Sequence, residues 1–198
     1  MVSGSALTAL TQPAAWDEAR YRRLLNPVVT ALAPSGIRRF FDLAETMTDV
    51  ISLGVGEPDF QTPWHIRDAG IQSLKAGKTR YTSNAGLMEL RQEIAAYMNR
   101  KYSLEYAPQG EILVTVGGSE AIDCCIRALL SAGDEVIIPE PSFVCYPPIV
   151  ALCGGKTVFV HTRAEDEFRL TGAALRAAIT PKTKLLVLPF PNNPTGAV

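Results

Sequence analysis

A turn that could bind a phosphate group stands near the middle of the chain. A strand-like run at residues 112–116 leads into Gly117, Gly118 and Ser119, and apolar residues follow at helical spacing over residues 122–129. Such a turn leaves backbone N–H groups free at the positive end of a helix dipole, where an anion is stabilised. The glycines allow close approach and the serine hydroxyl adds a donor. A purely structural strand–helix turn explains the same residues equally well.

The elements around this turn alternate between strand and helix. Strands are expected at residues 135–139, 156–160 and 184–188, and helices at residues 147–153 and 171–179. This alternation predicts an α/β fold with a mostly parallel sheet covered by helices on both faces. Ligands of such sheets bind at the carboxyl ends of the strands. The turn after Val116, the loop containing Phe143 and the loop that follows Leu188 are all expected to open on that edge.

The part of the chain before the turn is expected to be mainly helical. Residues 1–33 form an arm, and the expected elements after it are a helix at 35–47, a short strand at 49–53, a helix from Pro63 to a stop at Gly77, and a helix from Leu87 to about Lys101. The loop at 54–60 contains two glycines and has much backbone freedom.

Composition excludes several classes of protein. The 198 residues are 47% hydrophobic and 20% charged, with a net charge of −1, so nothing favours nucleic acid or an anionic membrane as a partner. No apolar run is long enough to span a bilayer. The four cysteines have no CxxC spacing and lie in apolar surroundings, which predicts reduced, buried thiols in a cytoplasmic protein. Two histidines far apart in the sequence give a metal site little to build on.

Four segments together resemble the fold-type I, pyridoxal-phosphate-dependent aminotransferases of class I/II, the aspartate aminotransferase superfamily. They are Ser52-Leu-Gly-Val-Gly-Glu-Pro-Asp-Phe60, Tyr81 with Asn84-Ala-Gly86, Thr115-Val-Gly-Gly-Ser-Glu-Ala121, and Asn193-Pro-Thr-Gly196. Their order and approximate spacing are those of the family, and the resemblance covers roughly residues 30–198. It implies a three-layer α/β/α architecture. Residues 1–56 would form the arm and part of a small domain, and residues 57–198 the first half of the large cofactor-binding domain.

The resemblance also implies roles for individual residues toward pyridoxal 5′-phosphate. Gly118 and Ser119, with the amide of Glu120, match the cradle of the cofactor phosphate. Phe143 matches the aromatic residue that stacks on the pyridine ring. Asn193 matches the asparagine whose amide donates to the phenolic oxygen and favours its ionised form. From the residues alone, Phe143 could equally be a core residue, and Asn193 a turn residue before proline.

Three further residues match the family less directly. Tyr81 resembles the tyrosine that reaches the cofactor phosphate of the neighbouring subunit, which implies a homodimer. Gly56 matches the loop glycine that approaches the substrate carboxylate, and Ile37 belongs to a segment expected on the substrate side. Cys124 and Cys125 are expected in the core.

The implied activity is transfer of an amino group from an L-amino acid to a 2-oxo acid. In the family, the Schiff-base lysine, the acid at the pyridine nitrogen and the arginine that binds the substrate carboxylate all follow the Asn-Pro-Thr-Gly motif. They are therefore expected beyond residue 198, so the chain contains no catalytic residue and by itself is an inactive N-terminal fragment. Within the family, the motifs look most like prokaryotic aspartate, aromatic and acyl-diaminopimelate aminotransferases. The alternatives are a non-catalytic truncated remnant or dimerising module, and a pyridoxal-phosphate-dependent lyase or synthase of the same fold.

Overall fold

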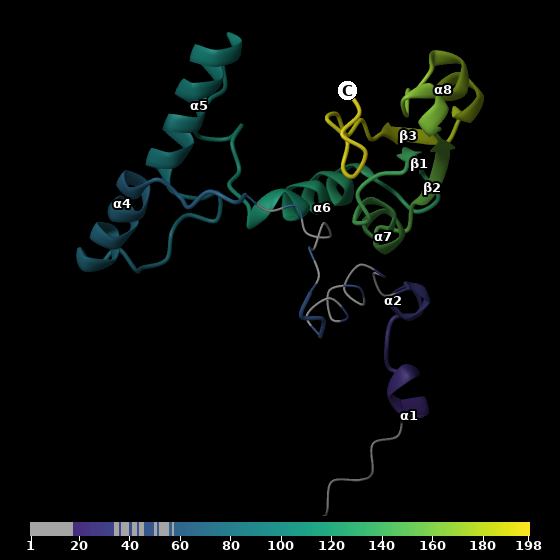
Figure 1. The fold of residues 1–198 in the computed structure, drawn as a ribbon, viewed down its shortest axis with the longest axis horizontal. Coiled ribbons are helices and arrows are strands. Elements are labelled where there is room, and N and C mark those ends of the chain that lie inside the picture. The colour runs from purple at the N-terminus through teal and green to yellow at the C-terminus, as the bar shows by residue number, and fades with distance from the viewer. Residues whose placement is uncertain are drawn as a thin grey trace, which may run out of the picture. The chain divides into compact units, whose positions relative to one another are not determined.

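The structure is a computed structural model that describes residues 18–33, 36, 40, 43, 46–49, 51, 56 and 58–198 (Figure 1). The chain forms two compact units. The sheet unit consists of Met1–Ser35 and Leu129–Val198, and the helical unit consists of Gly36–Ala128. The helix expected at residues 35–47 and the strand expected at 49–53 lie largely outside the described residues.

The helical unit contains α4 (Trp64–Lys75), α5 (Met88–Tyr102) and nearly all of α6 (Gly117–Leu129). These helices confirm the sequence pattern to within about one residue at most ends. Gly77 has a φ of +69° and ends α4 in the left-handed conformation that glycine adopts readily. Pro63 precedes α4 rather than opening it, because its ψ of 141° is that of extended chain.

The sheet unit contains the parallel sheet that the alternating pattern predicts. The arm contributes α1 (Glu18–Arg22) and α2 (Pro27–Ala31), and the remaining elements are β1 (Glu135–Glu140), α7 (Tyr146–Leu152), β2 (Lys156–His161), a 3-10 turn η1 (Ala164–Asp166), α8 (Gly172–Ala178) and β3 (Thr183–Leu186). The strand order is β2-β1-β3, and both pairs are parallel. Thr171 caps α8 by accepting a hydrogen bond from the amide of Ala174 at 3.2 Å. No helix among the described residues has the length and apolar character needed to cross a membrane.

The two crossovers place helices on both sides of the sheet. The connection through α7 moves one strand outward from β1 to β2, and the connection through α8 moves back past β1 to β3. Because parallel crossovers are right-handed, a reversal of direction moves the helix to the opposite face. Figure 1 shows α7 and α8 on opposite sides of the strands. Val136, Ile137 and Ile138 are 0% exposed, and since successive side chains alternate between faces, both faces of β1 are covered.

The expected strand at residues 112–116 is not formed among the described residues. A strand exists only where a neighbouring strand satisfies its backbone groups in a ladder. Among the described residues, the contact with another segment is a single backbone bond, from the amide of Val114 to the carbonyl of Ala85 at 3.1 Å. The residues have strand character, but the part of the chain that the structure describes gives them no partner strand. The cysteines also differ from expectation, because Cys125 is exposed and Cys124, Cys145 and Cys153 are only half-buried.

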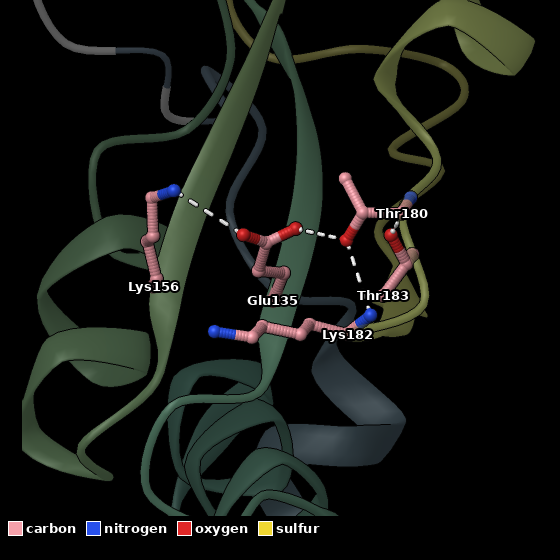
Figure 2. A network of polar contacts seen from close by, with 5 residues as sticks. All are labelled: Glu135, Lys156, Thr180, Lys182 and Thr183. Carbon is pink, nitrogen blue, oxygen red and sulfur yellow. Dashed lines mark hydrogen bonds and ion pairs between the residues drawn. The ribbon is translucent and has the colours of Figure 1, made fainter.

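A buried carboxylate holds the amino-terminal edge of the sheet together. Glu135 at the start of β1 is 6% exposed. Figure 2 shows Lys156 of β2 and Thr180, which precedes β3, approaching its two carboxylate oxygens from either side, at 3.2 and 2.6 Å. The Glu135 amide also donates to the Lys182 carbonyl at 2.8 Å. The register between β1 and β3 shifts at this point, from Glu135↔Thr183 to Val136↔Leu185, so Glu135 joins all three strands where the ladder is irregular.

These contacts lower the pKa of Glu135 below its ordinary value of 4.5, chiefly through the Thr180 hydroxyl and then through Lys156. A carboxylate with a lowered pKa in the folded state stabilises the fold above its unfolded-state pKa. That contribution is lost as the pH falls through the folded-state value.

We expect Glu135→Gln to lower stability at pH 7 and to flatten the loss of stability below about pH 4.5. Denaturant titrations of both proteins at neutral and acid pH measure this difference. Glu167→Gln is the matched control, because Glu167 pairs with Arg169 at the surface with 83% of its side chain exposed. Equal acid sensitivity of the Glu135→Gln variant and the unsubstituted protein would contradict the assignment.

Candidate functional site

The start of α6 presents unbonded backbone amides in open space. Gly117 has a φ of +80°, and an added Cβ at Gly117 or Gly118 would meet nothing within 4 Å. Among the described residues, the amides of Gly118 and Ser119 have no acceptor. The Glu120 carboxylate accepts a hydrogen bond from the Val116 amide, as in a capping box, so this side chain holds the turn while the amides remain available. Two amides, a hydroxyl and a helix dipole are what a phosphate requires.

A close contact inside the helical unit holds the segment that leads into this turn. Gly86 has a φ of +94°, and a Cβ built on it would lie 2.7 Å from Cβ of Val114. The bond from Val114 to Ala85 described above lies beside this contact. The Asn84-Ala-Gly86 turn therefore packs directly against the approach to the phosphate turn, and only glycine fits there.

Arg91 is a positioning residue that the sequence reasoning missed. It is 5% exposed, and its Nη1 donates to the carbonyl of Pro108 at 3.0 Å. The bond joins α5 to the turn at residues 107–111, which comes just before the approach to α6. Its signal in the sequence is its place on the apolar stripe of α5, between Leu87 and Ile94.

The other predicted residues of this part of the chain make no hydrogen bond or ring contact with the phosphate turn among the described residues. Tyr81 is 106% exposed, so its ring lies in solvent. Gly56 is exposed, with nothing within 4 Å of an added Cβ. Ile37 lies outside the described residues. The roles of these three residues therefore stay predictions.

In the sheet unit, the two loops predicted to hold the cofactor ring leave the same edge of the sheet and touch each other. Phe143 follows β1 and Asn193 follows β3, and parallel strands end on a common edge. Nδ2 of Asn192 donates to the carbonyl of Pro141 at 2.7 Å, which joins the loops across 51 residues of sequence. Sequence reasoning singled out Asn193 and overlooked Asn192.

Phe143 lies beside an apolar pocket of about 480 Å³ within the sheet unit. The lining includes Leu32 of the arm together with Val144, Pro147 and Phe159. Phe143 is half-buried, and its ring meets Tyr146 edge-on, with centroids 5.9 Å apart and an interplanar angle of 88°. Burial, and then the neighbouring Cys145, raises the pKa of Tyr146 above its ordinary value of 10.0. Asn193 is exposed.

The predicted site is thus composed of two parts. The helical unit brings together Gly118, Ser119 and Glu120 in an anion-binding turn. The sheet unit brings the loops of Phe143 and Asn193 to one edge beside an apolar pocket. In α/β proteins, loops at the carboxyl edge of the sheet and glycine turns that open a helix are each common places for small phosphorylated ligands to bind.

Comparison with known proteins identifies the family. The chain belongs to the aminotransferase class I and II family, whose model matches residues 48–198. It is 54% identical over 174 residues to the protein YugH of Bacillus subtilis, with 88% of this chain and 45% of that protein covered. It is 48% identical over 165 residues to an aspartate aminotransferase of Pyrococcus abyssi, with 83% and 42% covered.

Solved structures agree with this assignment. The aspartate aminotransferase of Thermus thermophilus with maleate matches with a TM-score of 0.81 and 42% identity, covering 88% of this chain and 46% of that one. The chain spans less than half the length of each of these relatives. The three-layer α/β architecture with a parallel sheet is therefore that of the corresponding part of an aminotransferase.

We expect Gly86→Ala to destabilise the approach to the phosphate turn, because it combines a left-handed backbone with a steric clash against Val114. Gly110→Ala is the matched control: its φ of +134° imposes backbone strain, but an added Cβ meets nothing within 4 Å. The free energy of unfolding should fall by about 1–2 kcal/mol for the control and by a further 1–3 kcal/mol, roughly, for Gly86→Ala. Equal losses in the two variants, measured by denaturant titration, would show that the contact does not matter.

Proposed function

We propose that the whole protein is a pyridoxal-phosphate-dependent aminotransferase, which transfers an amino group from an L-amino acid to a 2-oxo acid. This chain supplies the half that binds the cofactor. The observation that carries the proposal is the pair of amides at Gly118 and Ser119, which have no acceptor within the described part of the chain and stand at the start of a 13-residue helix. We assign residues 1–56 to the arm and part of a small domain, and residues 57–198 to the first half of the large domain.

The residues at the start of α6 suit the cofactor phosphate. A phosphate ester carries close to two negative charges at pH 7 and needs several donors. The amides of Gly118, Ser119 and Glu120 and the Ser119 hydroxyl provide them, and the helix dipole adds a favourable potential. The Glu120 carboxylate is already engaged by the Val116 amide, so it is held at the base of the turn.

The loops at the edge of the sheet suit the cofactor ring. Phe143, beside its apolar pocket, offers a flat face that holds an aromatic ring without adding charge. The exposed amide of Asn193 can donate to the phenolic oxygen and favour its ionised form. When bound, the cofactor supplies an electron sink for the carbanion and a carrier for the amino group. The residues of this chain bind and orient it.

The lysines near the Asn193 loop are poorly placed to act on the ring. Lys182 precedes β3 at the amino-terminal edge, beside Glu135 (Figure 2). Phe143 and Asn193 instead follow the carboxyl ends of β1 and β3. Lys184 lies near the start of β3. We therefore place the reactive lysine in the half of the relatives' length that this chain does not span.

The remaining assignments follow from the same proposal. Amino acids and 2-oxo acids are the partners, Gly56 and Ile37 line the substrate side, and the protein is cytoplasmic. The ring of Tyr81 lies in solvent, where a second subunit can meet it, and this supports a homodimer whose subunits complete each other's phosphate site.

Borohydride trapping tests the proposal. The whole protein and the 198-residue chain are each incubated with pyridoxal phosphate, reduced and mapped by mass spectrometry. We expect one stoichiometric lysine adduct in the whole protein, outside residues 1–198, and none in the chain alone. A stoichiometric adduct at Lys182 or Lys184 would overturn the assignment of the lysine.

Amino transfer by the whole protein from a panel of L-amino acids to 2-oxo acids is measured in parallel. Release of ammonia or sulfide in place of transfer would indicate a lyase of the same fold.

A further inference from the structure

The side chain of Asn192 connects the two loops at the carboxyl edge of the sheet. Its Nδ2 has two hydrogens: one goes to the carbonyl of Pro141 at 2.7 Å, and the other to Oγ1 of Thr195 at 2.9 Å. Its backbone also closes the loop that follows β3: the Asn192 amide donates to the Ala197 carbonyl at 2.9 Å, and the Asn192 carbonyl accepts from the Gly196 amide at 2.8 Å. One residue therefore fixes the shape of its own loop and the spacing to its neighbour.

The orientation of this amide follows from its partners. A carbonyl oxygen can only accept, so the atom 2.7 Å from Pro141 must be the nitrogen. The Oδ1 atom then lies out of solvent, with no donor among the described residues. A buried acceptor without a partner costs stability, on the order of 1–3 kcal/mol. A residue that bears such a cost while joining two ligand-facing loops suggests a functional constraint rather than a purely stabilising one.

We propose that Asn192 is a positioning residue for the cofactor ring: through Pro141 it fixes the Phe143 loop relative to Asn193. This inference rests on the proposed function. Pro141 is two residues before Phe143, and Asn192 is directly before Asn193, so the 2.7 Å bond joins the two loops close to both the stacking ring and the amide donor. Without it, each loop could still contact a ring, but the two contacts would no longer be held in one geometry. Small displacements of positioning groups are costly at such sites.

The decisive variant is Asn192→Asp, which preserves shape but removes both donors. At about pH 8 its carboxylate faces the Pro141 carbonyl and repels it. Burial against a carbonyl raises the pKa of the introduced acid, so at about pH 5 it is protonated and can donate its O–H to Pro141. Asn192→Ala removes the contact at every pH. Thr195→Val removes the acceptor within the loop but keeps the bond to Pro141. Asn99→Asp makes the matched change at an exposed position of α5.

Two measurements are made on the whole protein at both pH values. Amide hydrogen exchange of residues 142–146 is followed without cofactor. Binding of pyridoxamine 5′-phosphate is followed by its own fluorescence, since this probe has no aldehyde to react with surface lysines. At the higher pH, residues 142–146 of Asn192→Asp should exchange faster than those of the unsubstituted protein, and the variant should bind the probe about tenfold more weakly. At the lower pH, both its exchange and its binding should return to those of the unsubstituted protein. Asn192→Ala should not recover, and Thr195→Val and Asn99→Asp should keep slow exchange in residues 142–146.

The outcomes separate this inference from the proposed function. If the unsubstituted protein binds the probe, and Asn192→Asp matches it in both binding and hydrogen exchange at each pH, the positioning role is overturned while the proposed function stands. If weaker binding of Asn192→Asp does not recover at the lower pH, Asn192 is only structural and the inference is also overturned. If the unsubstituted protein binds no probe, the proposed function fails and this inference fails with it.

Discussion

The burial of the apolar centre of β1 between two parallel neighbours is the constraint on which the sheet unit depends. Three consecutive apolar residues, Val136 to Ile138, are covered on both faces, so the strand cannot slip by one residue without driving side chains into occupied space. The register with β2 runs without interruption from Glu135↔Lys156 to Glu140↔His161. Because that register is fixed, the point at which the chain leaves β1 toward Phe143 is fixed as well.

Polar contacts confirm the register at each end of β1. At the amino-terminal edge, Glu135 is bonded to groups that precede or begin both neighbouring strands. At the carboxyl edge, the Glu140 carbonyl accepts from the amide and hydroxyl of Thr162 at 2.8 and 2.7 Å, and its side chain pairs with His161 at 3.0 Å. A mispaired sheet would leave the buried carboxylate of Glu135 without these partners, and a buried charge without partners is destabilising.

Local patterns in the sequence predicted most elements of the fold. Alternation of β-branched runs with capped helices gave β1, β2, β3, α7 and α8, and Gly77 and Thr171 marked helix ends, because these signals act over a few residues. Residues 112–116 show the limit. Their strand character is local, but whether they form a strand depends on a partner elsewhere in the chain. Burial of the cysteines also depends on tertiary packing. The prediction of buried thiols was wrong for Cys125, which is exposed, and the other three cysteines are only half-buried.

The candidate site shows the same division. Motifs predicted Gly118, Ser119, Phe143 and Asn193 as site residues, because chemistry that contacts a ligand limits the choice of residue strongly. Asn192 and Arg91 were not predicted, because a residue that holds a loop can be of many types, and its partner carbonyl has no sequence signature. A contact across 51 residues becomes visible only in three dimensions.

The separation of the Glu135 network from the ligand-facing loops has an evolutionary consequence. The network lies at the amino-terminal edge of the sheet (Figure 2), and the loops proposed to face a ligand leave the carboxyl edge. Mutations that reshape the loops leave the hydrogen bonds of Glu135 untouched, so the loops can change during evolution while the sheet keeps its stabilising contacts.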